Sequence, residues 1–353
     1  MEIDHKRPVF VVGCMSGTSL DGLDICLASF QHEKDVIQPQ LIDAITVPYP
    51  RSLSDQLAGS FELSAFELKQ LDIELGRFIG EQVSVFLSKR ELTAHAVASH
   101  GHTIYHSPEN GFSFQIGSGH HISALTQTPV IYDFRSLDIA LGGQGAPLVP
   151  GVEKLLYPEY DCFLNLGGIA NVSFHHNMVS AFDICVCNML LNYLSNELGQ
   201  PFDDNGTLAR QGKPAPDIVD HWNNLPYHHQ SPPKSLGREW FEEHIEPTLD
   251  GNAFDLLRSG VEFISDQIAC ALDQDAFESV LVTGGGAFNG FLMERISEKV
   301  DIRLTIPEKT HVAFKEAYSF AALGYLRLTE KVNTLSSVTG ASKDSIGGSI
   351  CIP

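Results

Sequence analysis

Three times in this sequence an apolar, strand-like run leads directly into a glycine-rich bend. The stretches are VFVVGCMSGTSLDG at residues 9–22, CFLNLGGIANVS at 162–173 and VLVTGGGAFNG at 280–290. Glycine permits positive φ and close approach of backbone amides to a ligand, and tandem amides in such turns bind anions. One such bend is ordinarily a plain chain reversal. Three of like design predict a site in which two bends hold phosphates and the third lets a base or ribose lie against the backbone.

The two commonest phosphate motifs are missing. The sequence contains no G-x-x-x-x-G-K-[ST], and no G-x-G-x-x-G follows a strand-like run, which excludes a P-loop and argues against a Rossmann dinucleotide site. The first bend carries a carboxylate of its own, Asp21. This residue either holds Mg²⁺, directly or through water, or is an acid of an Asx-type turn.

Charge and composition narrow the class of partner. With 23 Lys and Arg against 44 Asp and Glu, the formal net charge is −21, so we expect neither nucleic acid nor an anionic membrane as a partner. Seven scattered cysteines suit reduced thiols better than a disulfide framework. No apolar run is long enough for a membrane helix and the N-terminus does not read as a signal peptide, so we expect a soluble, cytoplasmic protein. A homodimer is left open.

Short β-branched runs alternate with longer helical periods, which indicates an α/β architecture. The predicted strands cover residues 9–12, 24–30, 44–48, 96–99, 129–132, 162–166, 171–175, 179–182, 280–283 and 303–306. Helices are predicted at 188–197, 260–272, 288–299 and 315–328. The clearest helix starts at Ser64, where Ser64 and Glu67 form a capping box. Because the first strands include a hairpin, the sheet is expected to be mixed.

The segment after residue 130, DFRSLDIALGGQGAPLVPGVEKLLYP, is rich in glycine and proline. We place the change of domain there, which predicts an N-terminal lobe of residues 1–130, joined by the tail 331–353, and a C-terminal lobe of residues 131–330. The proline-rich block 203–238 is too long for an idle connection, so it is predicted to be a functional loop region or an insertion.

The first bend, GCMSGTSLDGLD, resembles the first phosphate hairpin of the sugar kinase–actin superfamily, and more closely that of the anhydro-N-acetylmuramic acid kinases. The resemblance runs nearly the whole length, through SHGHTIYHSP, FSFQIGSGHHIS, PVIYDFRSLDIALGGQGAPLVP, NLGGIANVS, FDDNGTLARQG, PPKSLGREWF and TGGGAFNG, in the family's order. It implies two actin-like, ribonuclease H-like lobes with mixed sheets flanked by helices and the nucleotide in the cleft between them.

The resemblance also implies the reaction. ATP with Mg²⁺ would phosphorylate O6 of anhydro-N-acetylmuramic acid while water opens the 1,6-anhydro ring at C1, a step of cell-wall recycling. The ATP contacts are then predicted in the three bends, at Gly17, Thr18, Ser19, Leu20, Asp21, Gly22, Asn165, Gly167, Gly168, Asn171, Gly284, Gly285, Gly286 and Asn289.

The family's general base is the Asp that opens its F-D-T-G-P-G-N motif, which falls on Asp183. Asp also favours the N-cap of a helix, and NMLLN follows shortly, so a capping role stays open. Ile184, Cys185, Val186 and Cys187 replace T-G-P-G here. This departure would change the fit or choice of sugar, or reflect a different packing solution.

Sugar contacts are predicted at four residues. Arg135 suits a bidentate grip on the sugar's carboxylate, with a domain-linking salt bridge as the alternative. The resemblance adds Glu316, Gln115 and His102, the last standing where the family usually has Gln. The neighbouring histidines fit no zinc spacing, and DDNGTLARQG lacks the glycine and glutamate of a calcium loop.

Two other functions remain open on the sequence. A kinase-like sensor that binds nucleotide without turnover is suggested by the changed T-G-P-G segment. A glycoside hydrolase that uses paired carboxylates without ATP would leave the three phosphate-style bends unexplained.

Overall fold

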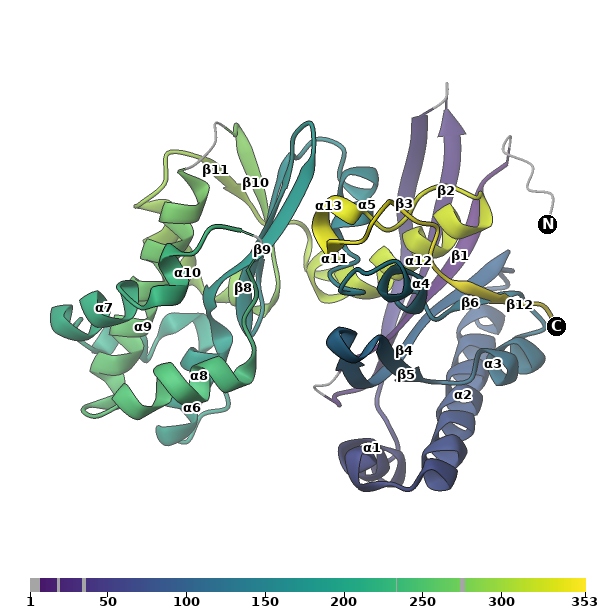
Figure 1. The fold of residues 1–353 in the computed structure, drawn as a ribbon, viewed down its shortest axis with the longest axis horizontal. Helices are drawn as coiled ribbons and strands as arrows, with labels where there is room; N and C mark the ends of the chain where they lie inside the picture. Colours follow the sequence, from purple (N-terminus) through teal and green to yellow (C-terminus); the bar gives the residue numbers. More distant parts are fainter. Residues whose placement is uncertain (1–6, 18–19, 34–35, 233, 274–276) are drawn as a thin grey trace. The chain divides into compact units, whose positions relative to one another are not determined.

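The computed structural model describes residues 7–17, 20–33, 36–232, 234–273 and 277–353. They form two compact units, one of residues 1–158 with 314–353 and one of residues 159–313. Each unit is built on its own mixed β-sheet with helices packed against it (Figure 1), as the α/β pattern predicts.

The first unit contains a seven-stranded sheet in the order β12-β6-β4-β1-β2-β3, with β5 paired to β4. The hairpin β1–β2 is antiparallel and β1–β4 is parallel, which confirms a mixed sheet. The strands are β1 (Val9–Ser16), β2 (Leu23–Glu33), β3 (Val36–Val47), β4 (Ala96–Ser107), β5 (Phe112–Ile116), β6 (Val130–Tyr132) and β12 (Ser349–Cys351).

Helices cover both faces of this sheet. The capping box predicted at Ser64 and Glu67 is present and starts α2, whose apolar face packs on Val12 and its neighbours. On the other face α12 comes so close that a Cβ at Gly13 would overlap the carbonyl oxygen of Ala317. The helices are α1 (Arg51–Ala58), α2 (Ala65–Ser88), α3 (Gly119–Thr126), α4 (Ser136–Ala140), α5 (Pro150–Leu156), α12 (Lys315–Leu328) and α13 (Ser336–Thr339).

The limits of the first unit lie at residues 158 and 314, whereas the sequence analysis placed them at 130 and 330. β6 pairs with β4, and α5 packs against α12 through the buried ion pair of Glu153 and Lys315, whose atoms are 2.8 Å apart. Figure 1 shows the yellow C-terminal segment, with α12 and β12, returning to strands of the first sheet. The glycine- and proline-rich segment after residue 130 therefore belongs to the first unit by its contacts.

The second unit has a five-stranded sheet in the order β11-β10-β7-β8-β9. Its strands are β7 (Cys162–Leu166), β8 (Ile169–His175), β9 (Val179–Val186), β10 (Ser279–Thr283) and β11 (Arg303–Thr305). Its helices are α6 (Asn188–Glu197), α7 (Pro216–Asn223), α8 (Arg238–His244), α9 (Ala253–Leu272), α10 (Gly290–Ser297) and α11 (Lys309–Ala313).

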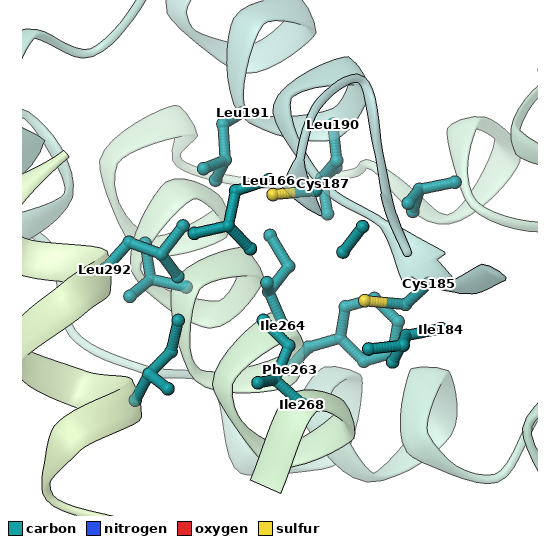
Figure 2. Packing of buried hydrophobic residues seen from close by; sticks show 14 of the residues in the cluster. Leu166, Ile184, Cys185, Cys187, Leu190, Leu191, Phe263, Ile264, Ile268 and Leu292 are labelled. Atoms are coloured by element: carbon teal, nitrogen blue, oxygen red, sulfur yellow. The ribbon is translucent and has the colours of Figure 1, made fainter. Parts of the chain in front are cut away.

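One hydrophobic core lies between this sheet and helices α6, α9 and α10. Figure 2 shows Cys185 and Cys187 inside it, among Leu190, Phe263 and Ile264. The side chains of residues 184–187 are all buried, which means that the segment replacing T-G-P-G packs into the interior of the unit. This burial fits the packing solution among the alternatives that the sequence left open.

Two helices start away from their predicted positions. α9 begins at Ala253 rather than at residue 260, because the side chain of Asn252 caps it. α10 begins at Gly290 rather than at 288, because Gly285–Phe288 forms a separate 3-10 turn. In the described parts of the chain no helix is both long enough and apolar enough to span a membrane.

Candidate functional site

The first glycine bend joins β1 to β2 at the predicted place. Leu20 and Gly22 both have positive φ, of 59° and 157°. A Cβ at Gly22 would lie 2.7 Å from the carbonyl oxygen of Val47, so only glycine fits there. Asp21 is exposed, while Thr18 and Ser19, both predicted nucleotide contacts, lie outside the described residues.

The second and third bends lie side by side in the second unit. A Cβ at Gly284 would lie 2.6 Å from the carbonyl carbon of Leu166, just before the second bend. The side-chain amide of Asn188 donates to the carbonyl oxygen of Leu166 at 2.9 Å and borders Gly286 of the third bend. The structure thus brings together Asn165, Gly167, Gly168 and Gly284–Gly286, which the sequence could only assign to separate bends.

Beside the third bend lies a pocket of about 450 Å³. Three predicted nucleotide contacts line it: Gly285, Gly286 and Asn289. The sequence analysis missed the other lining residues as contacts, namely Asn188, Leu191, Asn192, Phe202, Asp203, Asp204, Asn205 and Phe288. The only signal for residues 203–205 was their place in the proline-rich block, where they looked like an imperfect calcium loop.

The turn at residues 203–205 is held in place by the side chains of Asp203 and Asn205. The carboxylate of Asp203 is buried and accepts the backbone N–H groups of Leu208 and Ala209 at 2.7 and 3.0 Å. Asn205 accepts the N–H of Gly290 at 3.1 Å, at the start of α10. The turn therefore forms a fixed wall of the pocket, and its role in a calcium site is not supported by these contacts.

Asp183 lies in strand β9 and not at the start of α6. The N-cap of α6 is Cys187, so the capping role that the sequence left open for Asp183 is wrong. The register aligns Asn165 with Asn171, and Asn171 with Asp183, across three neighbouring strands. Paired residues point to the same face of a sheet. Since the alternate residues Leu164, Val172 and Ile184 belong to the core, this polar row faces away from it.

The block 203–238 also builds the surroundings of Asp183. The N–H of Leu236 donates to one carboxylate oxygen of Asp183 at 2.9 Å, and the hydroxyl of Tyr227 donates to its backbone carbonyl at 2.7 Å. Burial raises the pKa of Asp183, and the bond from Leu236 opposes this rise. A carboxylate with a raised pKa is a stronger proton acceptor than an ordinary Asp, which is the property that a general base requires.

The four predicted sugar contacts all belong to the first unit. Arg135 follows β6 and donates to the ring of His100 on β4 and to the carbonyl oxygen of Gly145. Glu316 begins α12, and its negative charge is the neighbour that stabilises the charged guanidinium of Arg135. These contacts lie within the first unit.

Glu316 belongs to a group of charged residues at the start of α12. Loss of solvation and the negative charge of Asp24 raise the pKa of Glu316, while Arg135 and Lys315 oppose the rise. Glu316 is thus an acid whose charge interacts with that of Arg135.

His102 is the last member of a short hydrogen-bonded chain. The hydroxyl of Tyr49 donates to Oγ of Ser16 at 2.7 Å, and Ser16 lies 2.9 Å from Nδ1 of His102. Because the oxygen of Ser16 accepts from Tyr49, its own hydrogen is free to point at His102. Gln115, on the paired strand β5, donates to Ser113 and Thr103. The structure therefore places His102 and Gln115 on neighbouring strands, with separate partners.

Among the described residues no group of three or more His, Cys, Asp and Glu side chains has the arrangement of a metal site. The seven cysteines all lie in described parts of the chain, and five of them are buried.

The family model and the relatives that match this chain carry the same description. Residues 9–353 match the family model described as anhydro-N-acetylmuramic acid kinase. A protein of that name from Sulfurimonas denitrificans is 33% identical, covering 97% of this chain and 99% of the relative. Another from Crocosphaera subtropica is 34% identical, covering 98% and 99%.

Among solved structures, the ADPNP-bound activator of 2-hydroxyisocaproyl-CoA dehydratase from Clostridium difficile matches with a TM-score of 0.44 and 10% identity, over 92% of this chain and 96% of the other. That likeness is too distant to bear on function. The family match spans nearly every element described above and includes all three glycine bends, Asp183 and Arg135. The chain belongs to the anhydro-N-acetylmuramic acid kinase family.

Proposed function

We propose that this chain is an ATP-dependent kinase that opens the 1,6-anhydro ring of anhydro-N-acetylmuramic acid with water and phosphorylates O6, giving N-acetylmuramic acid 6-phosphate. The observation that carries the proposal is the family match over residues 9–353. The geometry that supports it is the polar row ending in Asp183, on the sheet that also carries two glycine bends.

For the nucleotide, the pocket beside Gly285 and Gly286 is the proposed adenosine site. Its size of about 450 Å³ lies in the usual range of small-molecule pockets. Phe202 and Phe288, which line it, are 55% and 43% exposed, and exposed aromatic rings of this kind offer a stacking surface to a purine. The backbone and amide groups at Asn165, Gly167, Gly168 and Asn171 are the proposed phosphate contacts of this unit, and residues 17–22 those of the first.

Asp21 is the proposed residue for Mg²⁺. A magnesium ion in kinases is commonly bound by one or two carboxylates together with the phosphates of the nucleotide, so a single exposed carboxylate in a phosphate bend fits that pattern. When bound, the ion would neutralise charge that develops on the phosphates.

The chain's own groups would then act as follows. Arg135, Glu316, His102 and Gln115 bind and orient the sugar, with the guanidinium of Arg135 on its carboxylate. Asp183 accepts a proton from the water whose oxygen bonds to C1. As the C1–O6 bond breaks, O6 takes the γ-phosphoryl group and ADP leaves. The burial of Asp183 supports the role of base, because it raises the pKa of the carboxylate towards neutrality.

The replaced T-G-P-G segment gives no reason to prefer a sensor without turnover. Its side chains are buried in the core of the second unit, while Asp183 before it stays half-buried on the opposite face of the sheet.

One assay tests the reaction. Purified protein is given anhydro-N-acetylmuramic acid, Mg²⁺ and ATP, and both ADP and the sugar 6-phosphate are followed. We expect the two products in equal amounts. Release of sugar without phosphate would support a hydrolase, and binding of ATP without any product would support the sensor; either result contradicts the proposal.

Replacing Gly285 by Val tests the adenosine site. A Cβ at Gly285 would have Asn188 at 3.8 Å as its nearest neighbour, so the fold accepts a side chain there, yet the side chain would occupy the pocket. Filling a packed site in this way costs about 1–3 kcal/mol, so we expect the KM for ATP to rise about 10–100-fold with the KM for the sugar unchanged.

Gly59→Val is the matched control for this variant. Gly59 is an exposed glycine of the first unit, and its Cβ would make an ordinary contact of 3.5 Å with the backbone of Asp55. We expect wild-type kinetics from it. An unchanged KM for ATP in Gly285→Val, with the protein folded, would place the adenosine elsewhere.

A further inference from the structure

His100 is a buried imidazole with a defined partner on each ring nitrogen. Its side chain is 5% exposed and its ring lies 4.7 Å from the ring of Phe320, centroid to centroid. Nδ1 lies 3.0 Å from the carbonyl oxygen of Gly101. Nε2 lies 2.9 Å from Nη2 and 3.2 Å from Nε of Arg135.

These partners fix the tautomer. A carbonyl oxygen can only accept and a guanidinium can only donate, so Nδ1 must carry the hydrogen and Nε2 must offer its lone pair to Arg135. Burial, together with the positive charge of Arg135, lowers the pKa of His100 to about 3. At neutral pH the ring is therefore an uncharged acceptor for the guanidinium.

Two fixed groups hold the guanidinium of Arg135. Nε2 of His100 accepts from the N–H of Nε and from one N–H of Nη2, and the carbonyl oxygen of Gly145 accepts from Nη1 at 2.7 Å. Gly145 is itself held, because its N–H donates to the buried carboxylate of Asp138 at 2.8 Å. Three of the five N–H bonds of Arg135 are thereby used within the described structure.

One N–H bond remains on each of the two Nη atoms. Paired N–H groups of a guanidinium can bind the two oxygens of a carboxylate, which is the fork that makes Arg a selective carboxylate ligand. Burial lowers the pKa of Arg135 to about 10, so the group is still charged at neutral pH. His100 fixes the orientation of the guanidinium, because it binds the side formed by Nε and Nη2.

We infer that His100 is a positioning residue that directs the free N–H pair of Arg135 towards the carboxylate of the sugar. This inference rests on the proposed function, in which Arg135 binds that carboxylate.

Two substitutions test the hydrogen bonds of the two ring nitrogens of His100 separately. The amide of Gln reaches the position of Nε2, so His100→Gln keeps an acceptor for Arg135. The amide of Asn reaches only the position of Nδ1, so His100→Asn keeps the bond to Gly101 and loses the one to Arg135. We expect His100→Asn to raise the KM for the sugar about tenfold with kcat within about twofold, and His100→Gln to stay within about threefold of wild type.

Three controls make the result specific. His221→Asn, at an exposed position of α7, should leave the kinetics unchanged. Thermal unfolding of each variant shows whether it is folded at the assay temperature. With 1,6-anhydro-N-acetylglucosamine, which lacks the lactyl carboxylate, wild type and His100→Asn should have the same KM. Equal losses for both His100 variants, or equal losses on both sugars, would overturn the positioning role.

A spectroscopic readout is independent of the reaction. In ¹⁵N spectra of the histidine side chains, with the signals of His100 identified by their loss in His100→Gln, we expect the neutral Nδ1–H form to persist at pH 5, where an ordinary histidine is protonated. Protonation near pH 6.5 would contradict the geometry. If instead the spectra agree and wild type does not turn over the anhydro sugar, the proposed function fails while the held geometry of Arg135 stands.

Discussion

We expect Asp183→Asn to abolish turnover of the anhydro sugar, lowering kcat by about 10³-fold or more, and to leave ATP binding nearly intact. General bases commonly contribute about 10²–10⁴-fold, and an amide cannot take the proton of the attacking water. The substitution keeps the shape of the side chain, and the new amide oxygen can still accept from the N–H of Leu236. Steady-state kinetics measures the loss, and calorimetric titration with ATP tests whether the nucleotide site is unaffected.

The pH dependence of the wild-type enzyme gives the same assignment a second test. A general base must be deprotonated to act, so kcat/KM falls as the pH drops through its pKa. Because burial raises the pKa of Asp183, this acidic limb should lie above the ordinary value of about 3.9 for Asp. Asp217→Asn, at an exposed position of α7, is the control. It should keep the wild-type kcat and the wild-type fall of kcat/KM at acidic pH. Substantial residual turnover in Asp183→Asn would remove it as the base.

The parts of the fold that the sequence predicted depend on local signals. The capping box of α2 and the glycine bends after β1, β7 and β10 are each encoded within a few residues. Such signals act through φ and through hydrogen bonds between near neighbours, so they can be read without knowing the tertiary structure. The same holds for the hairpin β1–β2, since a bend between two apolar runs is sufficient to predict it.

What the sequence could not give depends on long-range packing. The limits of the first unit follow from α12, which returns to β1 and fits only because Gly13 has no side chain. The pocket combines residues from α6, from the turn at 202–205 and from the third bend, and the turn contacts the start of α10 through Asn205. The row of Asn165, Asn171 and Asp183 requires the register of three strands, and a shift by one residue would turn Asp183 into the core.

The burial of Cys185 and Cys187 also depends on long-range packing. By residue type alone, replacing two glycines by two cysteines beside Asp183 suggests a changed wall of the sugar site. Their place on β9 and at the start of α6 directs both side chains into the core, against residues such as Leu190 and Phe263 (Figure 2). The catalytic assignment therefore rests on Asp183 and its register and does not require the glycines.

Arg135→Leu should lower kcat/KM for anhydro-N-acetylmuramic acid about 100-fold, mainly through KM. A charge-assisted, bidentate contact is lost. The negative charge of Asp24 already raises the pKa of Glu316, and the charge of Arg135 that opposes this rise would be removed. Arg135→Lys should recover only part of the loss, because an ammonium group restores the charge without the fork. Arg51→Leu, whose native side chain is 96% exposed on α1, should behave as wild type.

Kinetics on a sugar without the carboxylate show whether Arg135→Leu loses recognition of that group or disrupts the site as a whole. On 1,6-anhydro-N-acetylglucosamine, Arg135→Leu should lose at most a few-fold in kcat/KM, since that sugar has no carboxylate for the guanidinium to bind. A comparable 100-fold loss on both sugars, with unfolding temperatures close to wild type, would mean that Arg135 acts on the sugar ring or on the charge of Glu316 instead. The proposed role of His100 would fail with it, because its only route to the substrate is through the guanidinium that it holds.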